Sequence, residues 1–162
     1  MKLHQNRELF NQAIRATAAN KNLLEIYVEK DYWMTLALHR IFHAEIGKEV
    51  VFKGGTALSK CFGTIQRFSE DIDLVVLRKE NETGNVLRTK LKNIGKAIES
   101  EMPEVDVKGV THKMGMIRKT AHSYKKEFDG EYGQVREVIV LEATWLGRYD
   151  PYHRQKINSY VY

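Results

Sequence analysis

The sequence has almost no cysteine: Cys61 is the only one among its 162 residues. An internal disulfide and a cysteine-based zinc site are therefore excluded, and this usage fits a reducing cytoplasm. The sequence also lacks an uninterrupted apolar run of about 18 residues, the length that a membrane helix needs, and no apolar signal-peptide core follows Met1. We therefore expect a cytoplasmic protein with no membrane partner.

No internal repeat and no low-complexity linker interrupts the sequence. Its length suits one domain, and its content of 43% hydrophobic and 29% charged residues is typical of a folded protein with a core. We expect one domain over residues 1–162, with N-terminal helices over 1–48 and a sheet core over 49–162. The net charge of +5 permits binding to nucleotides or nucleic acid but is also typical of an ordinary solvated surface.

Apolar residues recur at helical or alternating spacing along most of the sequence. Helices are predicted over residues 4–19, 23–46, 56–62 and 85–101. Strands are predicted over residues 50–52, 72–77, 105–107, 114–124 and 134–145, and residues 155–162 resemble the start of a further strand. This order, α-α-β-α-β-α-β-β-β, predicts an α+β (or α/β) fold in which helices flank one mixed sheet.

A glycine pair, Gly54-Gly55, stands between a short predicted strand and a predicted helix. Glycine lets the backbone approach a phosphate closely, and the first N–H groups of a helix are free to bind it. A tight turn is the ordinary explanation of such a pair, because Gly-Gly is common in loops. The pair alone leaves both interpretations open.

Two aspartates, Asp71 and Asp73, interrupt an apolar strand. Residues i and i+2 of a strand point to the same face, about 6–7 Å apart, and two unpaired charges there are costly to bury. Either a solvated strand edge or a metal ion that cancels their repulsion would account for them. Carboxylates at this spacing suit Mg²⁺ or Mn²⁺ held against the phosphates of a nucleotide.

The order of these features resembles the core unit of the polymerase-β-type nucleotidyltransferases: a strand, a Gly-Gly helix start, then a strand with Asp-x-Asp. The resemblance implies a polymerase-β-like nucleotidyltransferase fold. It also implies a third carboxylate on a neighbouring strand, which completes a site for one or two Mg²⁺ ions.

Glu142 is our candidate for the third acid. It interrupts the apolar residues 138–144 of the strongest predicted strand, which is the strand best placed to be central. The alternative is an exposed residue on a half-solvated strand. A rival acid, Asp106, belongs to a shorter predicted strand with more polar neighbours.

Two stretches carry a closer resemblance, Phe52-Lys53-Gly54-Gly55-Thr56-Ala57-Leu58-Ser59-Lys60 and Arg67-Phe68-Ser69-Glu70-Asp71-Ile72-Asp73-Leu74. They are similar to the AbiEii/AbiGii toxin family of nucleotidyltransferases, and Glu29-Lys30-Asp31-Tyr32-Trp33 resembles the N-terminal signature of that family. The resemblance implies the toxin of a bacterial toxin–antitoxin or abortive-infection system for phage defence. It further implies an NTP substrate, a tRNA, other RNA or protein acceptor, and a cognate antitoxin.

The resemblance also implies a nucleotide-binding set around the glycine pair: Lys53, Gly54, Gly55, Thr56, Arg67 and Ser69. The glycines and Thr56 would hold triphosphate oxygens, and Ser69 could reach a phosphate from the strand face of Asp71. The lysine and the arginine would balance phosphate charge. The acids expected to bind metal and to catalyse transfer are Asp71, Asp73 and Glu142.

Family members are longer than this sequence and carry a C-terminal, largely helical region with a further lysine and a Lys/Arg-Asp motif. Nothing here matches that region, so we expect that the sequence is truncated and that activity is incomplete. Two alternatives to a transferase follow. One is a metal-dependent phosphohydrolase that uses the same acids with water, and the other is a catalytically incomplete module that binds nucleotide or antitoxin.

Two further groups of residues have ordinary explanations. A basic stretch could face RNA phosphates or simply be solvated; its members are Lys113, Arg118, Lys119, Lys125 and Lys126. His39 and His43 have a spacing that can bind zinc, but a polar helix face is the interpretation we favour, because no third ligand is evident.

Overall fold

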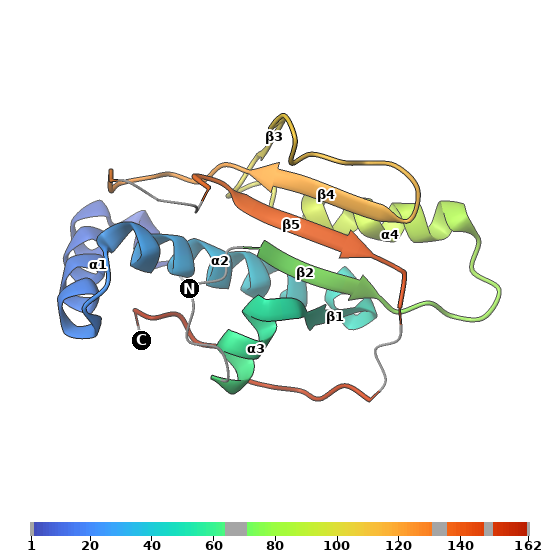
Figure 1. The fold of residues 1–162 in the computed structure, drawn as a ribbon, viewed down its shortest axis with the longest axis horizontal. Coiled ribbons are helices and arrows are strands. Elements are labelled where there is room, and N and C mark those ends of the chain that lie inside the picture. Colours follow the sequence, from blue (N-terminus) through green and yellow to red (C-terminus); the bar gives the residue numbers. More distant parts are fainter. Residues whose placement is uncertain (1, 64–70, 131–135, 148–150, 162) are drawn as a thin grey trace.

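A computed structural model describes residues 2–63, 71–130, 136–147 and 151–161, and within them the chain forms four α-helices and five strands (Figure 1). The helices are α1 (Arg7–Lys21), α2 (Glu25–His43), α3 (Gly54–Phe62) and α4 (Gly84–Lys96). The strands are β1 (Val50–Lys53), β2 (Asp71–Val76), β3 (Glu104–Val105), β4 (Ile117–His122) and β5 (Ile139–Thr144). Short 3₁₀ turns precede α1 (Leu3–Gln5) and follow α2 (Glu45–Glu49). The predicted order of elements is confirmed.

Local signals explain several of the helix ends. The Asn6 side chain accepts a hydrogen bond from Leu9 N and caps α1, and Thr83 caps α4 in the same way through Val86 N. α3 ends at Gly63, which adopts the left-handed conformation common after helices. α4 stops at residue 96 rather than at the predicted 101, and residues 97–101 continue as turns.

The sheet has the strand order β1-β2-β5-β4-β3 and is mixed. β2 and β5 pair in parallel, whereas the other neighbours are antiparallel. β5 is therefore the central strand, as the sequence predicted. The connection that makes β2 and β5 neighbours passes through α4, β3 and β4, so two distant parts of the sequence meet at the middle of the sheet.

The two faces of the sheet differ in character. One face carries the main core, and α2 and α4 pack behind it (Figure 1). Its buried strand residues are Val50, Ile72, Leu74, Val76, Ile139, Leu141 and Ala143. The other face carries the acids of β2 and β5, together with a small apolar cluster around Val140 and Ala121. Because side chains alternate along the strands, the acids lie together on the face opposite the main core.

α2 is the most buried helix, and it buries three consecutive ionisable side chains, Glu29, Lys30 and Asp31. Both oxygens of the Glu29 carboxylate accept hydrogen bonds, one from Glu127 N at 2.7 Å and the other from Phe128 N at 3.2 Å. Lys30 Nζ donates to the main-chain carbonyl of Arg136. None of the described helices, α2 included, is long and apolar enough to cross a membrane.

Glu29 should make the protein less stable as the pH rises towards neutrality. Burial raises the pKa of the Glu29 carboxyl from 4.5 to about 7, because its effect outweighs the two main-chain hydrogen bonds, which lower the pKa. The folded protein keeps this proton to a higher pH than the unfolded chain does. The stabilising contribution is therefore complete below pH 4.5 and is lost as the pH rises to 7, by about 3 kcal/mol in total.

Urea unfolding at pH 5 and pH 8 measures this effect, with Glu29→Gln as the matched variant that cannot ionise. Between the two pH values the wild type should lose about 2–3 kcal/mol more unfolding free energy than the variant loses. Equal losses in the two proteins would show that Glu29 does not titrate in this range.

The strand predicted over residues 155–162 is wrong for the described residues 155–161, which form no strand. This segment lies along α2 and α3 instead. The Asp31 carboxylate accepts hydrogen bonds from Ser159 Oγ at 3.0 Å and from Tyr160 N at 2.7 Å, and Gln155 Nε2 donates to Cys61 O. Hydrogen bonds to α2 and α3, rather than pairing with a strand at the sheet edge, thus hold this segment.

Candidate active site

Four charged residues form a row across the open face of the sheet. Lys53 of β1 pairs with Asp73 of β2, Asp73 pairs with Glu142 of β5, and Glu142 pairs with Lys119 of β4. Directly paired residues project to the same face of a sheet. Asp71 lies two residues before Asp73 and shares this face, so the three predicted acids do gather on neighbouring strands.

The start of α3 lies directly against Asp73. Gly54 opens this helix with a φ of +79°, a conformation that favours glycine. A Cβ atom at position 54 would stand 2.2 Å from Asp73 Oδ2, far inside van der Waals contact. Glycine is therefore required at this position both for its backbone angle and for the space that the carboxylate takes.

Replacing Gly54 by alanine should displace the Asp73 carboxylate and reduce catalysis. We expect a loss of about 1–2 kcal/mol in unfolding free energy from the left-handed backbone, and about a 100-fold loss of transfer activity from the misplaced acid. Urea unfolding and an assay with labelled NTP measure the two effects separately.

Gly63 offers a matched control for that substitution. It also has a positive φ, +62°, but no atom of the described residues, its chain neighbours aside, lies within 4 Å of the place where its Cβ would stand. Gly63→Ala should therefore lose similar stability and keep its activity. Equal activity of Gly54→Ala and wild type would show that the contact with Asp73 has no catalytic importance.

The first turn of α3 begins beside the acids, and its N-cap residue supplies no side-chain cap. Lys53 is the N-cap residue, and its side chain makes no capping hydrogen bond. The Thr56 side chain is buried, and its hydroxyl donates to the main-chain carbonyl of Asp71 at 2.5 Å. Thr56 thus ties the helix to β2, while N–H groups of the first turn remain suited to an anion.

Lys119 lies between two of the acids. Its Nζ is 3.1 Å from Glu142 Oε2 and 3.6 Å from Asp71 Oδ2. Burial lowers the pKa of Lys119, but hydrogen bonds and charges of the two carboxylates outweigh it and raise the pKa above the ordinary value. On Asp73, burial and then the charges of Glu142 and Asp71 raise the carboxyl pKa. Among the described residues, the charges of these acids are partly balanced by Lys53 and Lys119 beside them and by Arg136 near Asp71.

The carboxylates of Asp71, Asp73 and Glu142 are suitable ligands for a hard divalent cation, although they are not yet close enough together to form a complete coordination site. Among the described residues, no three His, Cys, Asp or Glu side chains are close enough to hold a metal ion as they stand. Asp71 Oδ1 is buried and accepts no hydrogen bond from any described residue. Carboxylate oxygens are the ligands that Mg²⁺ prefers, and a cation would relieve the repulsion that raises the pKa of Asp73.

The remaining predicted residues have different outcomes. Lys53 is exposed at the edge of the row and adds positive charge near Asp73. Arg67 and Ser69 lie outside the described residues, so their predicted phosphate contacts stay predictions. The rival acid Asp106 follows β3 at the far edge of the sheet, with β4 and β5 between that strand and β2. Its position excludes it from this group of acids.

Two cations of the site were not predicted there. Lys119 was counted with the basic stretch; it lies between Ile117 and Ala121 on the same face of β4, but its place beside Glu142 follows only from the pairing of β4 with β5. Arg136 Nη1 lies 3.9 Å from Asp71 Oδ1 and was not singled out at all. Residue 136 precedes β5 without regular structure, so no spacing rule could place it.

Other predicted features lie apart from the acids. The remaining members of the basic stretch pair with acids of the chain: Lys113 and Arg118 with Glu104, Lys125 with Glu127, and Lys126 with Asp129 and Glu137. The rings of His39 and His43 stack at 4.0 Å between centroids on α2. They line a cavity of about 510 Å³ between α2 and residues 155–159, and no acid of the site lines that cavity.

The sheet, its flanking helices and the acids on its open face define an α+β nucleotidyltransferase fold. A family model described as "Nucleotidyl transferase AbiEii toxin, Type IV TA system" matches residues 36–162. The match covers most of the chain, which therefore belongs to this family of toxin nucleotidyltransferases. Its description implies an antitoxin as partner. The matched region begins after Glu29–Trp33, so the resemblance of that segment stays a prediction.

A search of curated proteins found no match to the chain.

Proposed function

We propose that this protein is a Mg²⁺-dependent nucleotidyltransferase toxin that moves a nucleotide from an NTP to a hydroxyl of an RNA, such as a tRNA, or of a protein. The contact between Gly54 and Asp73, with Glu142 paired beside it, supports the proposal most strongly. Through this contact, the start of α3, which is suited to bind an anion, lies beside Asp73 and Glu142. Phosphates and the cation that balances them need those two features together.

The residues of the chain suggest a division of roles. N–H groups of the first turn of α3 would bind triphosphate oxygens, and exposed Lys53 would add positive charge beside them. Asp71, Asp73 and Glu142 would hold Mg²⁺ or Mn²⁺, which when bound neutralises phosphate charge and favours the attacking hydroxyl. Lys119 would have to leave its position between Asp71 and Glu142, and the triphosphate offers it a new counter-charge.

The transfer balances without any further reactant. The acceptor oxygen forms a bond to the α-phosphorus of the NTP, and the bond to the bridging oxygen of pyrophosphate breaks. The proton of the acceptor hydroxyl passes to one of the site's carboxylates, and pyrophosphate leaves with its negative charge. An NTP as substrate places this chemistry in the cytoplasm, where a cognate antitoxin would restrain it as part of a phage-defence system.

The proposal is tested by incubating the protein with Mg²⁺, total tRNA and NTPs that carry a radiolabel at the α-phosphate. Labelled RNA, or a labelled protein band, supports the proposal when the label disappears with EDTA and in Asp71→Asn. Conversion of free NTP without any labelled acceptor would instead show a metal-dependent phosphohydrolase. Nucleotide binding with neither product would show a module that binds nucleotide or antitoxin without catalysis.

A further inference from the structure

Lys30 is the least expected charge in the protein. Its side chain is fully buried in α2, where burying an ammonium group is costly. A methionine of similar length would pack at this position without that cost. The ammonium donates a hydrogen bond to the main-chain carbonyl of Arg136, which lies 106 residues further along the chain. The hydrogen bond from the buried Lys30 ammonium thus fixes the backbone at residue 136, just before β5.

The neighbouring residue of α2 holds the same part of the chain at a second point. The Glu29 carboxylate binds the N–H groups of Glu127 and Phe128, shortly after β4. Two consecutive helix residues therefore fix the backbone at 127–128 and again at 136. The second of these points carries a side chain that reaches the site.

Arg136 projects from that point towards Asp71. Its Nη1 lies 3.9 Å from Asp71 Oδ1, the buried oxygen that accepts no hydrogen bond from a described residue. Lys119 Nζ lies 3.6 Å from the other oxygen, Oδ2. Each oxygen of Asp71 therefore has a cation of the described residues nearby, and that cation opposes the binding of a metal ion to the oxygen.

We propose that Lys30 is a positioning residue that sets the metal affinity of the site: it holds Arg136 in place, and the Arg136 guanidinium competes with a divalent cation for Asp71. The inference rests on the proposed function, because it requires the acids to bind metal. It goes further in placing control of that binding on a buried residue of α2 that touches neither metal nor nucleotide.

The test measures the affinity of the full chain for Mn²⁺ from the EPR signal of the free ion, without nucleotide. Arg136→Gln removes the competing charge and should tighten Mn²⁺ binding by about two- to fivefold, the range for half-exposed charge pairs. Lys30→Met should tighten it by the same factor, because it releases Arg136. The double variant should bind no more tightly than either single variant, since both changes act through one contact.

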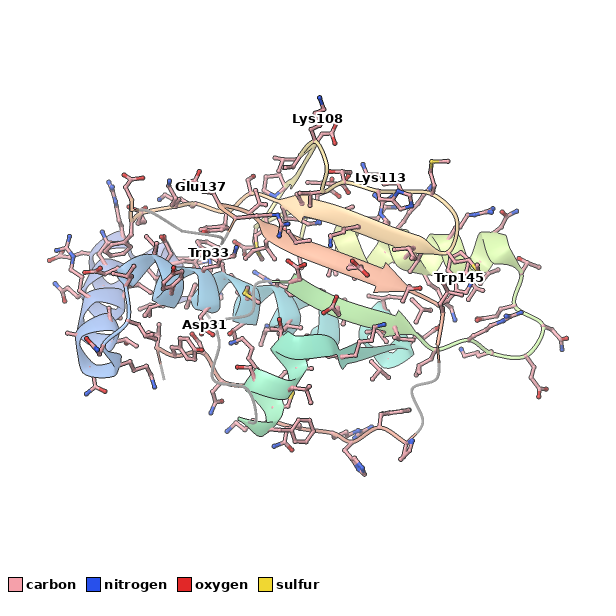
Figure 2. The ribbon with its side chains drawn as sticks, viewed as in Figure 1. Asp31, Trp33, Lys108, Lys113, Glu137 and Trp145 are labelled. Carbon is pink, nitrogen blue, oxygen red and sulfur yellow. The ribbon has the colours of Figure 1, made fainter. Side chains whose placement is uncertain are left out.

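Lys108→Gln is the matched control for a change in net charge. Figure 2 shows Lys108 at the tip of the loop that follows β3, pointing away from the sheet. The Mn²⁺ affinity of the Lys108→Gln protein should therefore equal that of the wild type. Urea unfolding verifies that each variant is folded. If Lys30→Met does not fold, Lys30→Gln, which is polar but too short to keep the hydrogen bond to the carbonyl of Arg136, replaces it in the same comparison.

Three results would overturn the inference, and they differ in what else they overturn. Weaker binding by folded Lys30→Met would show a structural role only, and additive tightening in the double variant would show two independent charges. In both cases the proposed function stands. Failure of the wild type to bind Mn²⁺ at all would overturn the metal-dependent function and this inference together.

Discussion

Asp73→Asn is expected to reduce nucleotide transfer by about a thousandfold, the loss typical of removing one group that stabilises transition-state charge. The asparagine keeps the shape of the side chain beside Gly54 but removes one of the charges that would hold metal. Transfer of label to the acceptor, measured at saturating and at limiting NTP, gives the loss in kcat and in kcat/KM. Glu142→Gln should have a similar effect, because Glu142 pairs directly with Asp73.

Stability and a second acid provide the controls for this result. Burial beside Glu142 and Asp71 raises the pKa of Asp73, so its ionised form is disfavoured in the fold and Asp73→Asn should not lower the unfolding free energy. Asp106→Asn changes an exposed acid beyond the far edge of the sheet and should leave transfer unchanged. Full activity in Asp73→Asn would refute the role of this carboxylate.

Asp31→Ala is expected to cost about 3–5 kcal/mol of unfolding free energy, because it leaves the buried ammonium of Lys60 without its counter-charge. Asp31 Oδ1 lies 2.5 Å from Lys60 Nζ, and both side chains are largely buried. Figure 2 shows Asp31 on α2, near α3 and residues 155–161. Its other oxygen holds Ser159 and Tyr160, so one residue of α2 joins α3 to the last described segment.

A double-mutant cycle identifies the source of that cost. Lys60→Met also breaks the pair, and the double variant Asp31→Ala/Lys60→Met should be more stable than the sum of the two single losses predicts. Glu45→Ala breaks an exposed pair with Lys48 and should cause no measurable change in urea unfolding. Additive losses in the cycle would show that the Asp31–Lys60 pair is not the source of the effect.

Alternation along single strands predicted much of the candidate site. Asp71 and Asp73 fall on one face because strand residues alternate, and Glu142 was found as an acid within the most apolar strand. The sequence could not show that Asp73 faces Glu142, because β2 and β5 are distant in sequence and their pairing depends on the whole fold. Lys119 was missed for the same reason: its neighbours belong to other strands.

The errors of prediction also have physical causes. Residues 155–161 have the composition of a strand but bind the Asp31 carboxylate and Cys61 O instead of a sheet edge. Glu29, Lys30 and Asp31 were noted only as part of a segment that resembles a family signature, because their partners at 127–128, 136 and 60 are set by tertiary contacts. A local pattern reveals that such charges need partners, but it does not reveal which.

The central claim is that the acids on the open face of the sheet bind a divalent cation beside a nucleotide held at the start of α3. A crystal of the protein with Mn²⁺ and a non-hydrolysable NTP, measured for the anomalous scattering of manganese, tests it most directly. The account predicts an anomalous peak among the carboxylates of Asp71, Asp73 and Glu142, with the triphosphate at Gly54 and Gly55. A bound nucleotide with no peak among these carboxylates, or manganese bound elsewhere, would contradict it.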